Sequence, residues 1–178
     1  PQVPYLPVNS SDISNEQSKQ ALLLKVKDLI GFPCFIKPAN LGSSVGITKA
    51  DSTDSFFKGI NKARSLDKRI VIEKAVKARE LECAVLGKED LKASGVGEII
   101  FEAEWYDYET KYSPGGAKTL IPARLSKDIT NKVRELTIKA CKAISADGMA
   151  RVDFFFKEES GQLWINEINT LPGFTEQS

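Results

Sequence analysis

The sequence predicts an α+β fold built from two small subdomains, and its hydrophobic pattern shows why. Helices and strands alternate through the first 73 residues. Beyond Glu73 short apolar strands dominate, and one long amphipathic helix interrupts them. Hydrophobic residues form 42% of the 178 residues, which is enough for an ordinary core. We therefore divide the chain into a first subdomain, residues 1–73, and a second, residues 74–178.

The first subdomain is expected to open with a Pro-rich extended segment and to contain two helices. Ser14–Gln17 resembles a capping box, and apolar residues recur at helical spacing after it until Gly31 and Pro33 end the helix. A second helix is predicted over residues 53–66. Three short apolar runs are predicted strands: residues 34–37, 45–49 and 69–73.

The second subdomain is expected to be mostly strand. Its helix begins at the N-cap Ser126, runs to about Ala146 and stops at Gly148. Ile129, Val133, Leu136, Ala140 and Ile144 are the positions expected to be buried. Strands are predicted over residues 81–86 and 97–104 and over the two runs that carry Arg151 and Glu167.

Polar residues recur at alternate positions of the last two strands. Arg151 and Asp153 share one face of the first strand, and Glu167 and Asn169 share one face of the second. The residues expected to face the core are Val152, Phe154, Phe156, Trp164 and Ile168. Two carboxylates and an amide, in a chain without histidine, favour a hard cation such as Mg²⁺. A solvated edge strand with scattered charges is the alternative.

A Gly- and Ser-rich segment lies between two predicted strands. Lys37 and Pro38 precede Gly42–Gly46, where small residues let backbone N–H groups approach an anion. The spacing is not that of a Walker loop. A nucleotide here would lie between layers with the hairpin as a lid, and the alternative is an ordinary tight turn.

Two further segments offer groups for a nucleotide. Glu73–Val76 ends a strand, so its backbone could bind an adenine edge, and Glu80 could accept hydrogen bonds from a ribose. In the turn-rich aromatic loop between Trp105 and Ile121, Lys111 could reach a phosphate and Tyr112 could donate a hydrogen bond. The alternatives are solvated charges for the first segment and a surface loop for the second.

These motifs, in this order, resemble the ATP-grasp superfamily and within it the D-alanine-D-alanine ligases. The resemblance implies two α+β subdomains with ATP between them: a central lid subdomain over residues 1–73 and a C-terminal subdomain over 74–178. The matching segments span nearly the whole chain, and the most specific is Asn166–Gly173.

The resemblance also implies a role for each candidate residue. The ATP contacts would be Lys37, Ser44, Glu73, Lys74, Ala75, Val76, Glu80 and Lys111. Asp153, Glu167 and Asn169 would hold two Mg²⁺ ions, with Mn²⁺ as a possible substitute. Arg151 and the Gly173 N–H would stabilise an oxyanion, and Ser43, Ser44 and Tyr112 would belong to the lid and the second-substrate environment.

By the same resemblance, ATP phosphorylates the carboxylate of one D-alanine, and the amine of a second attacks the acyl phosphate. The product would be D-alanyl-D-alanine for peptidoglycan precursors. No histidine base is needed when positioning and electrostatics drive phosphoryl transfer. The alternatives are a ligase for D-serine, less readily D-lactate, as in glycopeptide resistance, and a catalytically silent nucleotide-binding module.

Composition excludes several classes of partner. Lys and Arg number 25 against 24 Asp and Glu, so no net field recruits nucleic acid or an anionic membrane. Three widely spaced cysteines fit buried, reduced thiols and a cytoplasmic location. The chain starts without methionine and stops after the polar strand, so we expect a fragment. By the resemblance, it would lack the family's N-terminal domain and extreme C-terminus and be inactive alone, and the intact protein would be a homodimer.

Overall fold

The computed structural model describes residues 1–101 and 117–173, which form two compact units. The first unit contains residues 2–76. The second contains residues 77–101 and 117–173 together with Pro1. Each unit combines helices with an antiparallel sheet of its own, so the α+β class expected from the sequence is confirmed.

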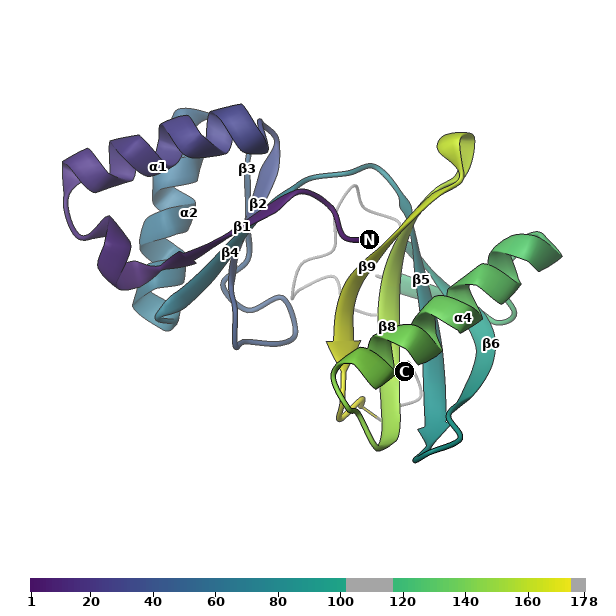
Figure 1. Cartoon of the computed structure of the whole chain (residues 1–178). Helices are drawn as coiled ribbons and strands as arrows, with labels where there is room; N and C mark the ends of the chain where they lie inside the picture. The colour runs from purple at the N-terminus through teal and green to yellow at the C-terminus, as the bar shows by residue number, and fades with distance from the viewer. Residues whose placement is uncertain (102–116, 174–178) are drawn as a thin grey trace. The chain divides into compact units, whose positions relative to one another are not determined.

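The first unit is built on a four-stranded sheet with the order β1-β4-β2-β3 (Figure 1). Its strands are β1 (Tyr5–Asn9), β2 (Cys34–Pro38), β3 (Thr48–Ala50) and β4 (Arg69–Lys74). All neighbours are antiparallel. β1 was expected only as part of a Pro-rich extended segment, because Pro4 lies just before it and Pro7 lies within it. Pro7 is compatible with the sheet because β1 is an edge strand.

Two helices pack on this sheet, α1 (Glu16–Leu29) and α2 (Thr53–Leu66), preceded by a short 3₁₀ turn η1 (Ser10–Ile13). The cap of α1 is Asn15, whose side chain accepts a 2.8 Å hydrogen bond from the Ser18 N–H, one residue after the predicted Ser14. α2 has the predicted bounds and a capping box between Ser52 and Ser55. Its residues Phe56, Ile60 and Ala63 are buried, as expected from helical spacing.

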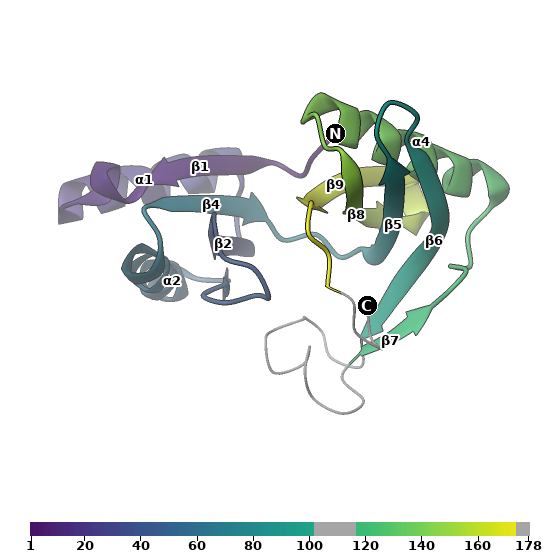
Figure 2. The same ribbon diagram turned by 90° about the horizontal axis from the view of Figure 1, so that it is seen from below.

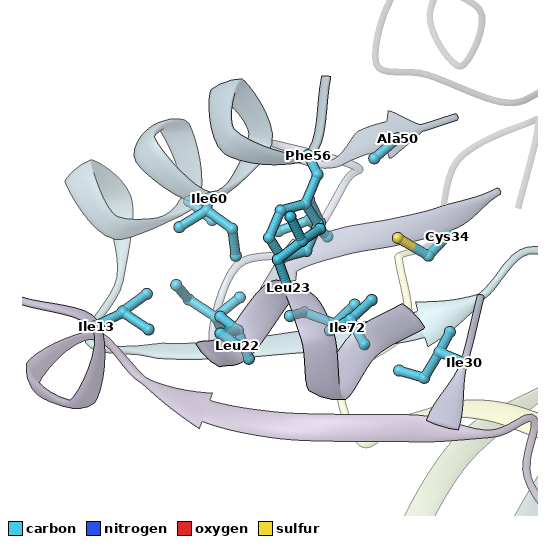
Figure 3. Packing of buried hydrophobic residues seen from close by; sticks show 13 residues of the cluster. Ile13, Leu22, Leu23, Ile30, Cys34, Ala50, Phe56, Ile60 and Ile72 are labelled. Atoms are coloured by element: carbon cyan, nitrogen blue, oxygen red, sulfur yellow. The ribbon is translucent and has the colours of Figure 1, made fainter. Parts of the chain in front are cut away.

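The core of the first unit lies between these helices and the sheet. Figure 3 shows Phe56 and Ile60 of α2 meeting Leu22 and Leu23 of α1 above Ile72 of β4. Phe56 and Ile72 are fully buried, and Phe57 packs edge-on against Phe56 with ring centroids 5.5 Å apart. The packing of α1 and α2 residues against Ile72 holds both helices over one face of the sheet.

The second unit contains a five-stranded sheet with the order β7-β6-β5-β8-β9 (Figure 2). Its strands are β5 (Arg79–Gly87), β6 (Lys92–Phe101), β7 (Ala117–Leu120), β8 (Gly148–Lys157) and β9 (Gln162–Asn169), with the 3₁₀ turn η2 (Glu158–Ser160) between the last two. All pairs are antiparallel. β7 lies in the segment that the sequence predicted to be a loop.

Helix α4 (Lys127–Ala143) covers one face of this sheet (Figure 1). Its N-cap is the predicted Ser126, whose hydroxyl accepts a 3.3 Å hydrogen bond from the Ile129 N–H. Val133 and Ala140 are buried against β5, β6 and β8, but Ile144 is 51% exposed because the helix ends before it. The prediction that Ile144 is buried is therefore wrong.

The three cysteines, Cys34, Cys83 and Cys141, are free and buried, as the sequence predicted. Burial raises the pKa of the Cys34 thiol to about 11, which makes this thiol unreactive at neutral pH. In the part of the chain that is described, no helix is both long enough and apolar enough to span a membrane.

Candidate functional site

The site is on the face of the second sheet opposite α4. Residues of β5 and β8 alternate strictly: those facing α4 are buried, and those between them are half-buried. The buried set is Leu81, Cys83, Val85, Val152, Phe154 and Phe156. The other set includes Arg151 and Asp153, so these residues share one face, as predicted.

A β-bulge at Asn166 places the second polar pair on this same face. Phe154 pairs with Ile165 and Asp153 pairs with Glu167, so Asn166 is an extra residue in β9 with no partner in β8. Without it, alternation would put Glu167 on the same side as Leu163 and Ile165, which pack in the core. The extra residue therefore brings Glu167 beside Asp153, and Asn169 beside Arg151.

Because of the same bulge, one residue that was expected in the core lies on the other side of the sheet. Trp164 pairs with Phe155 and lies before the bulge, on the side of the sheet away from the buried Phe154 and Phe156. The expectation that Trp164 faces the core assumed unbroken alternation, and it is wrong. The expectation for Ile168, which packs against the core, is confirmed.

We call the residues Glu82, Arg151, Asp153, Glu167 and Asn169 the polar face. Within it, Arg151 and Asp153 form a two-pronged ion pair: Nε to Oδ1 is 2.7 Å and Nη2 to Oδ2 is 2.8 Å. The Asn169 amide donates a 3.0 Å hydrogen bond to Asp153 Oδ2. Three of the four residues singled out in the sequence thus contact each other directly, and the fourth, Glu167, pairs with Asp153 across the strands.

The polar face concentrates negative charge. The pKa of Arg151 lies well above its ordinary value, chiefly because Asp153 accepts its hydrogen bonds. The pKa of Asp153 is also raised, first by burial and further by the charge of Glu167, although Arg151 opposes the shift. Both pKa values are thus raised, but for different reasons. The ion pair favours the charged form of Arg151, whereas one guanidinium does not offset the cost of burying the charged Asp153 beside Glu167. A bound cation would relieve this.

The donors present fit a hard divalent cation. Asp153, Glu167 and Asn169 offer carboxylate and amide oxygens, which Mg²⁺ prefers. Among residues 1–101 and 117–173, no three His, Cys, Asp or Glu side chains are arranged to hold a metal by themselves. Such a site would therefore depend on Asn169 and on oxygens supplied by a ligand, as is usual for Mg²⁺ at phosphate sites.

Glu82 is a residue of the polar face that the sequence reasoning missed. It pairs with Asp153 from β5, and its Oε1 lies 3.4 Å from Nη2 of Arg151. A signal for it existed in the sequence, because Glu80 and Glu82 alternate with the buried Leu81 and Cys83. Glu80, the proposed ribose contact, lies on the same side of β5 and pairs with Phe155.

In the first unit, Lys37 and Glu73 are brought together. They come from neighbouring strands β2 and β4 and form an ion pair. Glu73 is one of the few buried charged residues, at 8% exposure, and the Lys37 ammonium also lies 6.0 Å from the centre of the Phe35 ring. The sequence reasoning gave these two residues separate parts of a nucleotide, whereas the structure shows them in direct contact.

The predicted hairpin between β2 and β3 is present, and its tip consists of two successive turns. The Val45 N–H donates to the Gly42 carbonyl, and the Ile47 N–H donates to that of Ser44. Ser43 and Ser44 both have positive φ, 54° and 59°, which is uncommon for consecutive residues with side chains. Gly46 has φ of 78°, and a Cβ there would lie 2.5 Å from Leu66 Cδ1, so both its conformation and its space require glycine.

An aspartate at the end of α2 holds the start of this loop. The Asp67 carboxylate accepts hydrogen bonds from the Asn40 N–H at 2.7 Å, from the Asn40 amide and from the Arg69 N–H at 3.1 Å. These bonds hold the pKa of Asp67 below its usual value, first through the Arg69 and Asn40 backbone groups. The loop is thus tied to the body of its own unit.

Two backbone N–H groups of the strand end at Lys74–Val76 already donate hydrogen bonds within the fold. The Lys74 N–H donates to Pro4 and the Ala75 N–H to Pro33, at 2.9 and 3.1 Å. The Lys74 side chain is exposed, and Ala75 and Val76 are half-exposed. A ligand bound at this edge would therefore compete with Pro33 for the Ala75 N–H.

Three remaining candidates lie at or beyond the edges of the described residues. Gly173 is exposed and follows Leu171, which is 91% exposed. Lys111 and Tyr112 lie outside the described residues.

The chain is similar to known proteins over its whole length. The family model described as "D-ala D-ala ligase C-terminus" matches residues 1–178. A D-alanine–D-alanine ligase of Prochlorococcus marinus is 56% identical over 178 residues, which are the whole chain and 51% of the relative. One from a Synechococcus strain is 54% identical over 177 residues, 99% of the chain and 50% of the relative. The chain spans about half the length of the curated relatives it matches.

Two solved structures share the fold. The VanG D-Ala:D-Ser ligase of Enterococcus faecalis has a TM-score of 0.83 and 31% identity, covering 99% of the chain and 50% of that structure. The D-alanine-D-alanine ligase of Coxiella burnetii has a TM-score of 0.78 and 34% identity, covering 99% and 44%. The fold is therefore shared with two structures that are named as ligases of D-alanine.

Proposed function

The chain belongs to the D-alanine–D-alanine ligase family, whose members have the ATP-grasp fold, and we propose that the intact protein joins two D-alanine molecules in an ATP-dependent reaction. The carboxylate of the first D-alanine attacks the γ-phosphate of ATP, which gives D-alanyl phosphate and ADP. The amine of the second then attacks the acyl carbon, and phosphate leaves. The product is D-alanyl-D-alanine, a precursor for peptidoglycan.

The observation that carries this proposal is the polar face. Arg151, Asp153, Glu167 and Asn169 lie together on one side of a sheet in a chain that matches the ligase family throughout. The charge balance there is negative, and the donors are oxygens, which suits a site for magnesium and phosphate.

The metal set of the proposal is Asp153, Glu167 and Asn169, which would hold two Mg²⁺ ions. The ions, when bound, would neutralise negative charge on the phosphates. Arg151 has five N–H donors, of which its Nε and Nη2 groups bond Asp153. Its cationic fork and the exposed Gly173 N–H are the donors that we assign to the oxyanion formed when the amine attacks.

The remaining assignments of the proposal concern the nucleotide and the lid. Lys37 and Lys111 would bind phosphates, Glu73 and the Lys74–Val76 backbone the adenine, and Glu80 the ribose. Ser44 would belong to the ATP contacts, and Ser43 and Tyr112 to the second-substrate environment. The strand register supports one of these assignments. Glu80 lies two residues before Glu82 in β5, so its side chain is on the same side of the sheet as the polar face.

The wider proposal follows from the family. We assign residues 1–73 to the central lid subdomain and 74–178 to the C-terminal subdomain of the ATP-grasp fold. The intact protein would act on small molecules in the cytoplasm, without nucleic acid or membrane, as a homodimer. The buried free thiols of Cys34, Cys83 and Cys141 support a reducing compartment.

Product analysis of the intact protein tests the reaction. With ATP, Mg²⁺ and D-alanine, we expect equal amounts of ADP, phosphate and D-alanyl-D-alanine, separated by chromatography and identified by mass spectrometry. Omitting D-alanine should reduce ADP formation to background. Failure of D-alanine to stimulate ADP formation, with another acceptor doing so, would overturn the proposal.

A D-alanine–D-serine ligase is the second candidate, and the similarity to the VanG D-Ala:D-Ser ligase supports it. The higher identity to D-alanine–D-alanine ligases favours the first candidate. An equimolar mixture of D-alanine, D-serine and D-lactate separates them. We expect D-alanyl-D-alanine to dominate, and a majority of the mixed D-serine product would favour the second candidate.

A further inference from the structure

Three carboxylates lie in one row across the second sheet. Glu82 of β5 pairs with Asp153 of β8, which pairs with Glu167 of β9. The next row contains Ala84, Arg151 and Asn169. Because Ala84 is small, the long Arg151 side chain has room to lean across the strands, and its Nη2 approaches Glu82 as well as Asp153.

Arg151 therefore has acidic partners on two strands. Its strongest contact is the two-pronged pair with Asp153 on its own strand, and the looser one is the 3.4 Å approach to Glu82. Both carboxylates are half-buried, with side-chain exposures of 15% and 22%. Such shielding makes the contact to Glu82 more significant than a pair in open water.

In the proposed reaction, Asp153 cannot fully keep its contact with Arg151 and also bind a metal ion. If Asp153 binds a divalent cation, its oxygens are drawn from the guanidinium, and the cation repels Arg151. Arg151 would then need another anchor to stay aimed at the reacting carbonyl. Glu82 lies on the side of Asp153 opposite Glu167, so it can hold Arg151 without joining the metal set.

We propose that Glu82 is a positioning residue that keeps the Arg151 guanidinium in place while Asp153 binds metal, an inference that rests on the proposed ligase function. Glu82 is not itself assigned as a ligand. Its strand lies on the far side of Asp153 from Glu167, and the described side chains include no group of three acidic, His or Cys residues that could hold a metal. In this proposal Glu82 acts through Arg151, whose Nη2 lies 3.4 Å from Glu82 Oε1.

The test is a kinetic cycle on the intact protein with Glu82→Gln, Arg151→Lys and the double variant. Glu82→Gln keeps the size of the side chain and removes its charge. We expect kcat to fall about tenfold, as for other residues that support a metal-site group. The KM for ATP and the Mg²⁺ concentration for half-maximal rate should change less than about twofold. In the Arg151→Lys background, Glu82→Gln should cost nothing further.

The matched control is Glu158→Gln. This change also removes a carboxylate that contacts an arginine in the same unit, since Glu158 lies 2.9 Å from Nη1 of Arg79. It is outside the polar face and should leave kcat unchanged. Thermal unfolding of each variant shows whether a loss of activity is a loss of folded protein.

Each contrary outcome has a meaning. A rise in the Mg²⁺ requirement at unchanged kcat would make Glu82 a ligand and overturn the proposal, as would an equal drop in kcat in both Arg151 backgrounds. An independent readout is the hydrogen exchange of the Arg151 side-chain N–H groups by NMR, with Mg²⁺ and ADP present. Glu82→Gln should speed it, and unchanged exchange would refute the positioning role. If the wild type shows no D-alanine-dependent ADP formation, the ligase proposal fails. The hydrogen exchange of the Arg151 side chain would still show whether Glu82 holds Arg151 in place.

Discussion

Asp153 is the carboxylate around which the polar face is organised. Arg151 and Asn169 donate to it, and Glu167 repels it from the adjacent strand. Burial disfavours the charged form of the carboxylate, so the pKa of Asp153 remains raised despite the ion pair. One residue thus carries both the strongest hydrogen bonds of the site and the unfavourable charge that a metal would relieve.

Replacing Asp153 with Asn tests that role. We expect Asp153→Asn to lower the turnover of the intact protein about a hundredfold or more, because a neutral amide is a weaker Mg²⁺ ligand. Binding of ATP should change only modestly, since most nucleotide contacts lie elsewhere. Steady-state ADP release and calorimetric ATP titration measure the two effects.

The control for this change is Glu159→Gln, which alters an exposed carboxylate in the turn between β8 and β9. It should leave turnover unchanged. Full activity in Asp153→Asn would refute the metal assignment. No turnover in the wild type, together with only a modest change of ATP affinity in the variant, would favour the catalytically silent binding module instead.

The bulge in β9 is the element that assembles the site. Deleting Asn166 would restore regular alternation, so either Glu167 turns toward the core or Leu163 and Ile165 leave it. We expect the deletion to abolish Mg²⁺-dependent ADP release and binding of Mn²⁺, which electron paramagnetic resonance detects. Asn166→Ala keeps the extra residue and should retain activity within about tenfold. Equal activity of the two variants would show that the bulge is dispensable.

The loop of the first unit depends on one ionised carboxylate. The pKa of Asp67 is lowered because backbone N–H groups of Arg69 and Asn40 donate to its charged form. Its contribution to folding is present above the unfolded pKa of about 3.9 and is lost as the pH falls through the lower folded value. Stability should therefore decrease on acidification in that range.

Comparing the wild type with Asp67→Asn tests this linkage. Urea unfolding, followed by a probe in the first unit, should show a difference in unfolding free energy at pH 6 that shrinks below about pH 4. The reason is that Asp67 becomes protonated in the unfolded chain near pH 4, and in the folded chain only at the lower folded pKa, so the advantage of its charged form decreases over this range. A difference of the same size at pH 6 and pH 3.5 would contradict the assignment.

At the scale of the whole molecule, the described residues form two hydrophobic cores, one in each unit. One surrounds Phe56 and Ile36 in the first unit, and the other surrounds Phe154 and Leu81 in the second. Each core is sealed by its own helices and sheet, so each unit should respond to core mutations largely by itself.

A matched pair of variants tests this independence. Phe56→Leu and Phe154→Leu each replace a fully buried aromatic ring by a smaller side chain. Each should lower the stability of its own unit by about 1–2 kcal/mol. Native-state hydrogen exchange should speed in β2 and β4 for the first variant and in β5 and β8 for the second. Acceleration in both units by either variant would show that they unfold together.

Much of this architecture was predictable from local pattern. The bounds of α2, the N-cap Ser126 and the hairpin around Gly42–Gly46 follow from capping chemistry and periodicity, which act over a few residues. β1 was not predictable in this way, because its residues pair with β4 residues that lie 60 to 68 positions further along the chain. The end of α4 was placed too late, because apolar spacing continued past the last helical turn.

The sequence by itself determined the composition of the site: an arginine, two carboxylates and an amide at alternate positions, since side-chain chemistry and strand periodicity are local properties. Only the tertiary structure decided which groups meet. The bulge at Asn166 turns Glu167 toward Asp153, the neighbouring strand adds Glu82, and Lys37 pairs with Glu73. These contacts depend on the register between strands, which is set by the packing of whole sheets and is not encoded in any one segment.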